Sequence, residues 1–368
     1  MKLTISVTDF ANVLKQVCRV ALRSSGDILG QVLLDATATG LTISAQNGKQ
    51  QMTMSPNASA LTVEVPGAIC VNAAKLDQVI LSLPKDKPVS IVLKDDKLQI
   101  SSGRSRFNLV TTAAVNFPSV DFPVQDVIGS LKVAGGALTT GLRQVGFCAG
   151  RNDVRYYLNG VLFDLAPDSL TLAATDGHRL GVTEVPVNSC LSGQFILPST
   201  CIEDVAVFCG TGDVEVSFSK QMVRYTTHSG VLFSRLIDGT FPKYKNLLTN
   251  AAQGMIARVD RNEIASAVAR VTLLSDSKIP AVKLTLTNDE ISIQSISADV
   301  LNEANDVLPC SYKSEPLEIG MNGAMTTELL RALGSEEVDL YFRNDGSGTL
   351  FTTKNYPSHS FVLMPVRL

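Results

Sequence analysis

The sequence of 368 residues has few of the features that mark metalloproteins, nucleotide-binding enzymes and membrane proteins. Its three histidines, at positions 178, 228 and 359, are too few and too widely spaced to predict a metal cluster. Neither common glycine-rich phosphate-binding pattern occurs, so no nucleotide-binding loop is predicted. The apolar runs are strand-sized, far below the roughly 20 residues of a membrane-spanning helix. We therefore expect no metal, no cofactor and no membrane association.

Paired cysteines and an excess of positive charge are also missing. The seven cysteines include no C-x-x-C pair, which fits buried thiols in a reducing cytoplasm. The N-terminal residues alternate like a strand and lack the apolar core of a signal peptide. The formal net charge is −3, whereas a protein that holds DNA by charge alone is normally basic. We expect a cytoplasmic protein, and composition by itself argues against nucleic-acid binding.

What the sequence does contain is a threefold internal repeat. Apolar residues with helical spacing predict amphipathic helices at 10–17, 138–145 and 264–271, each preceded by an alternating strand. A second set of helices is predicted at 76–83, 202–209 and 326–333, followed by strands at 89–93, 214–218 and 338–342. Asp260, three residues before Glu263, is typical of a helix-opening capping pair.

The repeat predicts an α+β chain of three similar domains, each with two helices packed on antiparallel sheets. The repeating unit is about 125 residues long. We place the domains at residues 1–124, 125–252 and 253–368, with breaks near 116–127 and 250–254. A repeat of this size favours a stacked or ring-like arrangement over a catalytic cleft.

The predicted helices carry cations on the side away from the apolar stripe. A solvated face is the usual explanation for such charges, and Glu203 and Glu328 favour it on their own helices. The alternative is loose contact with phosphates that does not depend on base sequence. The cations are Lys15, Arg19, Arg23, Lys75, Arg143, Arg270 and Arg331.

The segment ATDGHRL at 174–180 has two interpretations. Asp176 and His178 could form an acid–base pair that acts with a serine in a hydrolase. In the repeat, however, Asp176-Gly177 takes the place of Asn47-Gly48, and both are turn dipeptides. We therefore expect a turn here and a protein that is not an enzyme, and we keep a hydrolase as an alternative.

Five motifs resemble those of the bacterial DNA polymerase III beta subunit family, the sliding clamps. They are DVRYYLNG at 153–160, ATDGHRL at 174–180, SGRSRF at 102–107, DGTFP at 238–242 and MPVRL at 364–368. The similarity runs from Met1 to Leu368 in matching order and spacing. It implies a non-catalytic processivity factor, a homodimer closed head to tail around double-stranded DNA with helices lining the hole. A ring holds DNA by topology, so weak contacts suffice and a net charge of −3 is acceptable.

The resemblance also implies site residues and partners. Contact with DNA is implied for Arg23, Asn152, Tyr156 and Tyr157. The implied partners are the DNA polymerase III catalytic subunit, the clamp loader and other proteins with a clamp-binding motif, all bound as extended peptides by aliphatic and methionine side chains. Their cleft, between the second and third domains, would comprise Arg155, Leu158, Thr175, Gly177, His178, Arg179, Leu180, Pro242, Leu247, Val362, Met364, Pro365, Val366, Arg367 and Leu368.

The two chains of the implied ring would meet through apolar and charged residues. Acids are few on one side of this joint, so we expect apolar packing to dominate. A diverged scaffold that keeps the cleft without encircling DNA is the alternative function. The implied joint places Phe107, Leu109, Lys97, Arg104 and Arg106 of one chain against Leu273, Leu274, Asp299 and Glu303 of the other.

Overall fold

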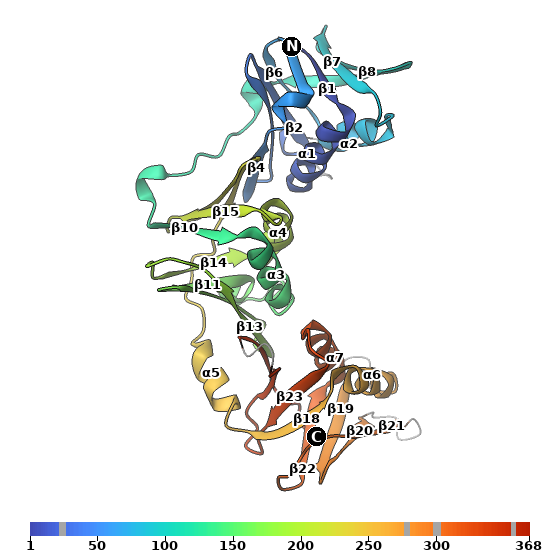
Figure 1. Cartoon of the computed structure of the whole chain (residues 1–368), viewed down its shortest axis with the longest axis vertical. Coiled ribbons are helices and arrows are strands. Elements are labelled where there is room, and N and C mark those ends of the chain that lie inside the picture. The colour runs from blue at the N-terminus through green and yellow to red at the C-terminus, as the bar shows by residue number, and fades with distance from the viewer. Residues whose placement is uncertain (22–26, 276–279, 297–302, 355–357) are drawn as a thin grey trace. The chain divides into compact units, whose positions relative to one another are not determined.

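A computed structural model describes residues 1–21, 27–275, 280–296, 303–354 and 358–368. The chain forms two compact units. Figure 1 labels their helices and strands. Unit one comprises Met1–Thr140, Val187–Leu191 and Thr200–Asp238. Unit two comprises Gly141–Pro186, Ser192–Ser199 and Gly239–Leu368.

Unit one is built on one antiparallel sheet. Its strands follow the order β10-β15-β16-β17-β4-β3-β2-β6-β9-β8-β7-β1-β5. Apolar residues alternate along these strands, so one face is buried, as Leu131 and Val133 illustrate on β10. The strands are β1 (Lys2–Ser6), β2 (Gln31–Thr37), β3 (Gly40–Gln46), β4 (Gln50–Met54), β5 (Leu61–Val65), β6 (Gly67–Asn72), β7 (Pro88–Lys94), β8 (Lys97–Ser102), β9 (Ser105–Ala113), β10 (Gly129–Ala134), β15 (Asp213–Phe218), β16 (Met222–Thr227) and β17 (Gly230–Arg235).

Helices cover the buried face of this sheet. Helix α1 (Val7–Val20) packs against α2 (Ala73–Ser82), α4 (Ile202–Cys209) and strands β3 and β4. Its stripe of Phe10, Leu14 and Val17 is fully buried, which is why this helix holds its place. Asn72 caps α2 by accepting a hydrogen bond from the backbone N–H of Lys75 at 2.9 Å.

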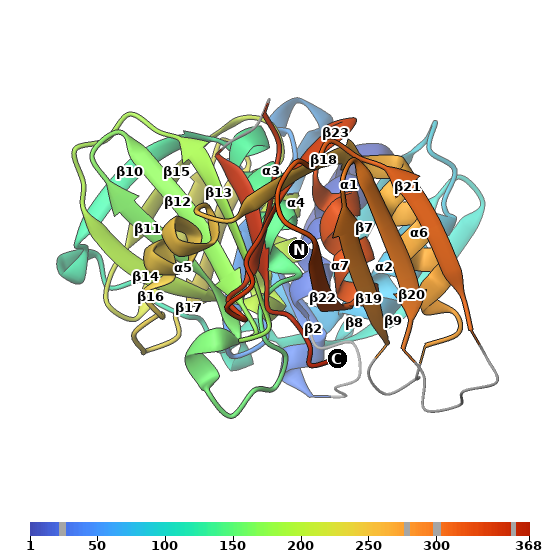
Figure 2. The same cartoon turned by 90° about the horizontal axis from the view of Figure 1, so that it is seen from below.

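Unit two contains two antiparallel sheets. One follows the order β14-β11-β12-β13-β25-β24-β23-β18 and the other β21-β20-β19-β22. Helices α6 (Arg261–Thr272) and α7 (Gly323–Ala332) pack on each other, and α6 also covers β20 and β21 (Figure 2). The strands are β11 (Gly160–Ala166), β12 (Ser169–Thr175), β13 (Arg179–Pro186), β14 (Gly193–Pro198), β18 (Met255–Asp260), β19 (Ala281–Thr287), β20 (Glu290–Ser295), β21 (Asn305–Pro309), β22 (Leu317–Asn322), β23 (Glu337–Phe342), β24 (Thr349–Thr352) and β25 (His359–Leu363).

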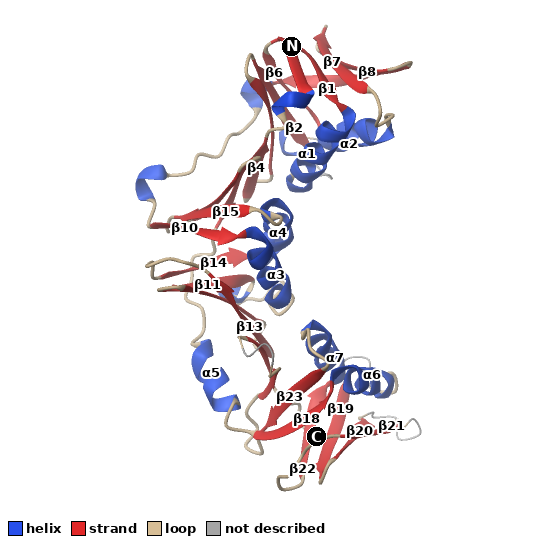
Figure 3. Cartoon of the chain, viewed as in Figure 1, coloured by secondary structure: helices blue, strands red, loops and turns tan. Residues whose placement is uncertain are grey.

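All six predicted helices are confirmed, as α1, α2, α4, α6, α7 and α3 (Gly135–Gly146), whose first residues belong to unit one and the rest to unit two (Figure 3). The predicted strands at 89–93, 214–218 and 338–342 are confirmed as β7, β15 and β23. Asp260 does cap α6, accepting from the N–H of Glu263 at 2.8 Å. One short helix, α5 (Tyr244–Ala251), was not predicted. None of the described helices combines the length and apolarity that crossing a membrane requires.

Strand pairing crosses the limits of the predicted domains. Strand β17 pairs with β4, placing Leu232 opposite Met52, and β13 pairs with β25, placing Leu180 opposite Val362. The two halves of the predicted middle domain therefore belong to different compact units. The domain limits at 124 and 252 stay predictions.

Candidate functional site

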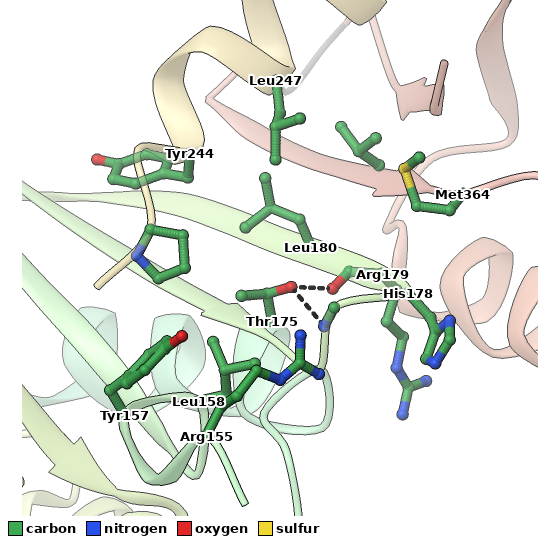
Figure 4. A pocket seen from close by; sticks show the side chains of 13 residues that line it. Arg155, Tyr157, Leu158, Thr175, His178, Arg179, Leu180, Tyr244, Leu247 and Met364 are labelled. Carbon is green, nitrogen blue, oxygen red and sulfur yellow. Dashed lines mark hydrogen bonds between the residues drawn. The ribbon is translucent and has the colours of Figure 1, made fainter. Parts of the chain in front are cut away.

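A cavity of about 140 Å³ lies in unit two where the ends of several strands meet helix α5. An apolar cavity of about 150 Å³ can hold a benzene ring, so this one has room for an apolar side chain. Its walls come from the loop at 155–158, strands β12, β13 and β25, and α5 (Figure 4). The lining residues are Arg155, Tyr157, Leu158, Thr175, Gly177, His178, Arg179, Leu180, Pro242, Tyr244, Leu247, Val362 and Met364, and we call this surface the cleft.

The floor of the cleft is aliphatic and its mouth is exposed. Leu158, Leu180 and Val362 are almost completely buried. Leu247 is 46% exposed and Met364 37% exposed, so both meet solvent. Leu180 and Leu247 point toward one another across the cavity (Figure 4). Concave surfaces of this kind take up apolar groups and use a few polar groups to orient them.

One side of the cleft is a tight turn between β12 and β13. The Oδ1 atom of Asp176 accepts hydrogen bonds from the N–H groups of His178 (2.9 Å) and Arg179 (3.0 Å). Gly177 has φ of +90°, a left-handed value that favours glycine. The turn predicted at Asp176-Gly177 is confirmed. The Asp176 carboxylate stabilises this turn, which accounts for it without an acid–base pair.

The side chain of Arg179 connects the turn to other parts of unit two through hydrogen bonds. Its side chain donates to Asp176 Oδ2 (3.0 Å), Glu328 Oε2 on α7 (2.6 Å) and the carbonyl oxygen of Phe147 (2.8 Å). The guanidinium also lies 5.3 Å from the centre of the Phe147 ring. Burial lowers the pKa of Arg179, but the hydrogen bond to Glu328 and the nearby negative charges, including Glu328 and Asp176, together raise it above its usual value. Arg179 therefore acts as a fixed cross-link beside the cleft.

Arg155 is a second fixed cation, at the rim. Its Nε and Nη2 atoms donate to the two carboxylate oxygens of Asp153 at 3.1 and 2.8 Å, and Nη2 also donates to the carbonyl of Asp176 at 3.2 Å. The hydrogen bonds from Arg155 lower the pKa of Asp153 to about 2. A Cβ atom on Gly177 would lie 2.8 Å from Nη2, so a larger residue here would displace the end of the Arg155 side chain.

The structure brings most of the predicted cleft residues together, but not the last four. Pro365, Val366, Arg367 and Leu368 do not line the cavity. Val366 instead donates its N–H to the carbonyl of Gly320 on β22 at 2.9 Å. Two lining residues were not assigned to the cleft from the sequence. Tyr157 was assigned to DNA contact, and Tyr244, close to the DGTFP motif, was not singled out.

The residues predicted to contact DNA are exposed wherever the structure describes them, apart from half-buried Tyr157. Arg19 Nε is 3.0 Å from Asp204 Oδ1 on α4, and Arg270 forms an ion pair with Asp306 on β21. Tyr156 is 58% exposed and meets Tyr157 edge to face. Arg23 lies outside the described residues. The exposed residues are Lys15, Arg19, Lys75, Arg143, Asn152, Tyr156, Arg270 and Arg331.

The residues predicted for a joint between chains are accessible in this single chain. Leu273 is 81% exposed and Leu274 is 41% exposed, directly after α6. Phe107 and Leu109 are half-buried on one face of β9. Lys97, Arg104, Arg106 and Glu303 are exposed, whereas Asp299 lies outside the described residues.

Family models for the DNA polymerase III beta subunit match nearly the whole chain. The N-terminal domain model matches residues 1–121, the central domain model 132–243 and the C-terminal domain model 249–367. The beta sliding clamp of Pseudomonas aeruginosa is 32% identical over 309 residues, which cover 82% of this chain and 83% of that protein. The beta sliding clamp of Escherichia coli strain K12 is 30% identical over 373 residues, with complete coverage of both (100%).

Solved structures agree with the sequence matches. The crystal structure of the DNA polymerase III subunit beta from Pseudomonas aeruginosa matches with a TM-score of 0.94 at 29% identity and covers 100% of both chains. The polymerase III beta structure from Caulobacter crescentus matches with a TM-score of 0.91 at 28% identity, again over 100% of both. The chain belongs to the bacterial DNA polymerase III beta subunit family, the beta sliding clamps, and is a non-catalytic component of a polymerase holoenzyme.

Proposed function

We propose that two copies of this chain close head to tail around double-stranded DNA and tether replication proteins through the cleft. The tethered partners are the DNA polymerase III catalytic subunit, the clamp loader and other proteins with a clamp-binding motif. The chain would act in the cytoplasm, where these partners and the DNA meet. The observation that carries the proposal is the cleft, because three distant segments build one apolar surface with an exposed methionine at its mouth.

The exposed helix cations support contact with DNA that does not depend on base sequence. Lys15 and Lys75 lie on the outer sides of α1 and α2, and Arg331 lies on α7. Phosphate contacts of this kind position a protein on DNA but read no bases. The ion pairs of Arg19 and Arg270 with acids weaken the positive potential, which suits a ring that must slide.

Open strand edges and exposed leucines support a joint between two chains. Residues 105–110 of β9 pair with β8 on one side only, and β21 is the edge strand of its sheet. Such edges can pair with another chain. Leu273 and Leu274 supply apolar surface near α6, and Phe107 supplies it on β9.

Retention on closed circular DNA tests the ring directly. The protein is loaded onto nicked circular plasmid by a clamp loader, washed with high salt and then treated with a restriction enzyme. We expect it to remain on the circle through the wash and to be released on linearisation, because its hold is topological. Gel filtration of the DNA-bound fraction measures both steps. Loss of the protein from circles during the wash would favour the scaffold that binds peptides without encircling DNA.

Gly348 offers a test of the shape of the cleft. A Cβ atom at this position would overlap Val362 Cγ1 and lie 3.3 Å from Met364 Sδ. Overpacking costs about 1–3 kcal/mol, so Gly348→Ala is expected to weaken binding of an apolar peptide about tenfold. The probe is a short fluorescein-labelled peptide whose only apolar side chains are leucine and phenylalanine, and binding is followed by fluorescence anisotropy.

The control for Gly348 is Gly334→Ala, because a Cβ atom at Gly334 would meet nothing within 4 Å. We expect that variant to bind the probe peptide like the unmodified protein. In a Val362→Ala background the Cγ1 methyl group of Val362 is absent, so Gly348→Ala should change the affinity for the probe peptide little. Equal losses in both backgrounds would show that steric overlap with Val362 is not the cause.

A further inference from the structure

A buried carboxylate behind the cleft has no role in the function proposed above. Asp164 lies in the middle of β11, among otherwise apolar residues, and is only 7% exposed. An ionised group at such a place is costly unless it is paired and hydrogen-bonded. Its partners therefore indicate what it does.

Three side chains surround the Asp164 carboxylate, and two of them come from helix α5. Gln194 Nε2 on β14 donates to Oδ1 at 2.8 Å. The hydroxyl of Tyr244 donates to Oδ2 at 2.7 Å, and Lys245 Nζ lies 2.9 Å from the same oxygen. Burial and the hydrogen bond to Asp164 raise the pKa of Tyr244, so its hydroxyl stays a donor at neutral pH. The carboxylate thus joins the sheet to the first turn of α5.

Helix α5 needs this attachment because its own start is weak. The helix has only eight residues, and Lys243 at its N-cap forms no side-chain capping bond. Yet α5 forms one wall of the cleft, through Tyr244 and Leu247. Figure 4 shows the hydroxyl of Tyr244 pointing away from Leu180 and Leu247, while its ring lies on the cleft side. One side chain therefore contacts the cleft with its ring and Asp164 with its hydroxyl.

We propose that Asp164 is a positioning residue of the cleft, which fixes α5 so that Leu247 and the Tyr244 ring meet the bound peptide. This inference rests on the proposed function of the cleft and adds the element that sets one of its walls. Asp164 itself would not touch the peptide, since it does not line the cavity.

Binding of the probe peptide and amide hydrogen exchange together test the proposal. We expect Asp164→Ala to weaken binding about tenfold and Tyr244→Phe, which removes only the hydroxyl, about threefold. Exchange at residues 244–251 should become faster in Asp164→Ala while exchange in β12 and β13 stays as it was. Tyr244→Phe keeps the test valid if Asp164→Ala fails to fold.

Asp339 supplies a matched control. It is also 7% exposed, lies on β23 of the same sheet, and accepts hydrogen bonds from Arg258 Nε and Nη2 at 2.6 and 3.0 Å. It does not line the cleft. Asp339→Ala should lower the melting temperature and leave the affinity for the probe peptide unchanged.

A double-mutant cycle separates positioning from general stabilisation. If Asp164 acts through α5, Leu247→Ala should reduce affinity strongly in the unmodified protein and only slightly in the Asp164→Ala background. If Leu247→Ala reduces affinity by the same factor in both backgrounds, the inference is overturned. The same holds if neither Asp164→Ala nor Tyr244→Phe changes the affinity. Either result would leave the proposed function of the cleft standing. If the unmodified protein fails to bind the probe peptide, the proposed function of the cleft fails and the inference fails with it.

Discussion

A lysine in place of Leu273 is expected to split the proposed dimer into monomers and to abolish retention on circular DNA. Leu273 is 81% exposed in the single chain, so the change should cost little folding free energy. In the proposed joint it would bury a charge near Lys97, Arg104 and Arg106 of the other chain. An unpaired buried charge costs several kcal/mol, so we expect the dimer dissociation constant to rise at least about 100-fold.

Sedimentation velocity across a range of protein concentrations measures this change. Ile256→Lys is the control, because Ile256 is 45% exposed on β18 and has no part in the proposed joint. The monomeric Leu273→Lys protein should still bind the probe peptide, since the cleft is formed within one chain. For the unmodified protein we expect the proposed dimer to persist at high salt, because we expect the joint to rely more on apolar packing than on ion pairs. A dimer that dissociates steeply with salt would contradict that expectation.

An aspartate in place of Met364 is expected to have the largest effect on peptide binding. Met364 is at the mouth of the cleft, 37% exposed, where an apolar anchor would cover it. Aspartate is preferred to lysine for this test, because a long side chain could carry its charge out to solvent. Loss of a strong interface contact costs about 2–4 kcal/mol, so the affinity for the probe peptide should fall about 100-fold.

Calorimetric titration with the probe peptide gives the affinity, and thermal unfolding checks the fold. Val124→Asp serves as the control, since Val124 is 64% exposed and belongs to unit one, whereas the cleft lies in unit two. The Met364→Asp protein should still form dimers, because Met364 has no part in the proposed joint. Binding that stays within a factor of about two would place the peptide site elsewhere.

The helices of this fold could be predicted because their signals are local. Apolar residues at helical spacing, such as Phe10, Leu14 and Val17, lie on one face of a helix, and this pattern can be recognised without knowing the rest of the fold. Side-chain caps such as Asp260 mark where helices begin. Helix α5 was not predicted because it has only eight residues and no side-chain cap.

Strand partners could not be predicted in the same way, because pairing is set by contacts between distant residues. The pairing of Leu232 with Met52 joins the predicted first and second domains, and that of Leu180 with Val362 joins the second and third. Nothing in the alternation of either strand selects its partner. The division into two compact units therefore became visible only in three dimensions.

The cleft was predictable where its residues lie in family motifs, and less so elsewhere. Most of the predicted lining residues do meet around one cavity. Tyr157 was not assigned to the cleft because the family resemblance implies contact with DNA for it, as it does for Tyr156. Asp164 had no signal, since a single acid within an apolar strand forms no pattern that indicates a partner.

The position of β25 in the chain has a consequence for protein synthesis. The turn at 175–179 emerges from the ribosome long before Val362 and Met364, which form the facing wall and lie within or just after β25. A polypeptide arrested before residue 359 therefore lacks Val362 and Met364 of the cleft and the strand that pairs with β13. Under the proposed function, partner proteins can dock only after Met364 has been translated, so nascent chains that stop before it would not compete for the polymerase.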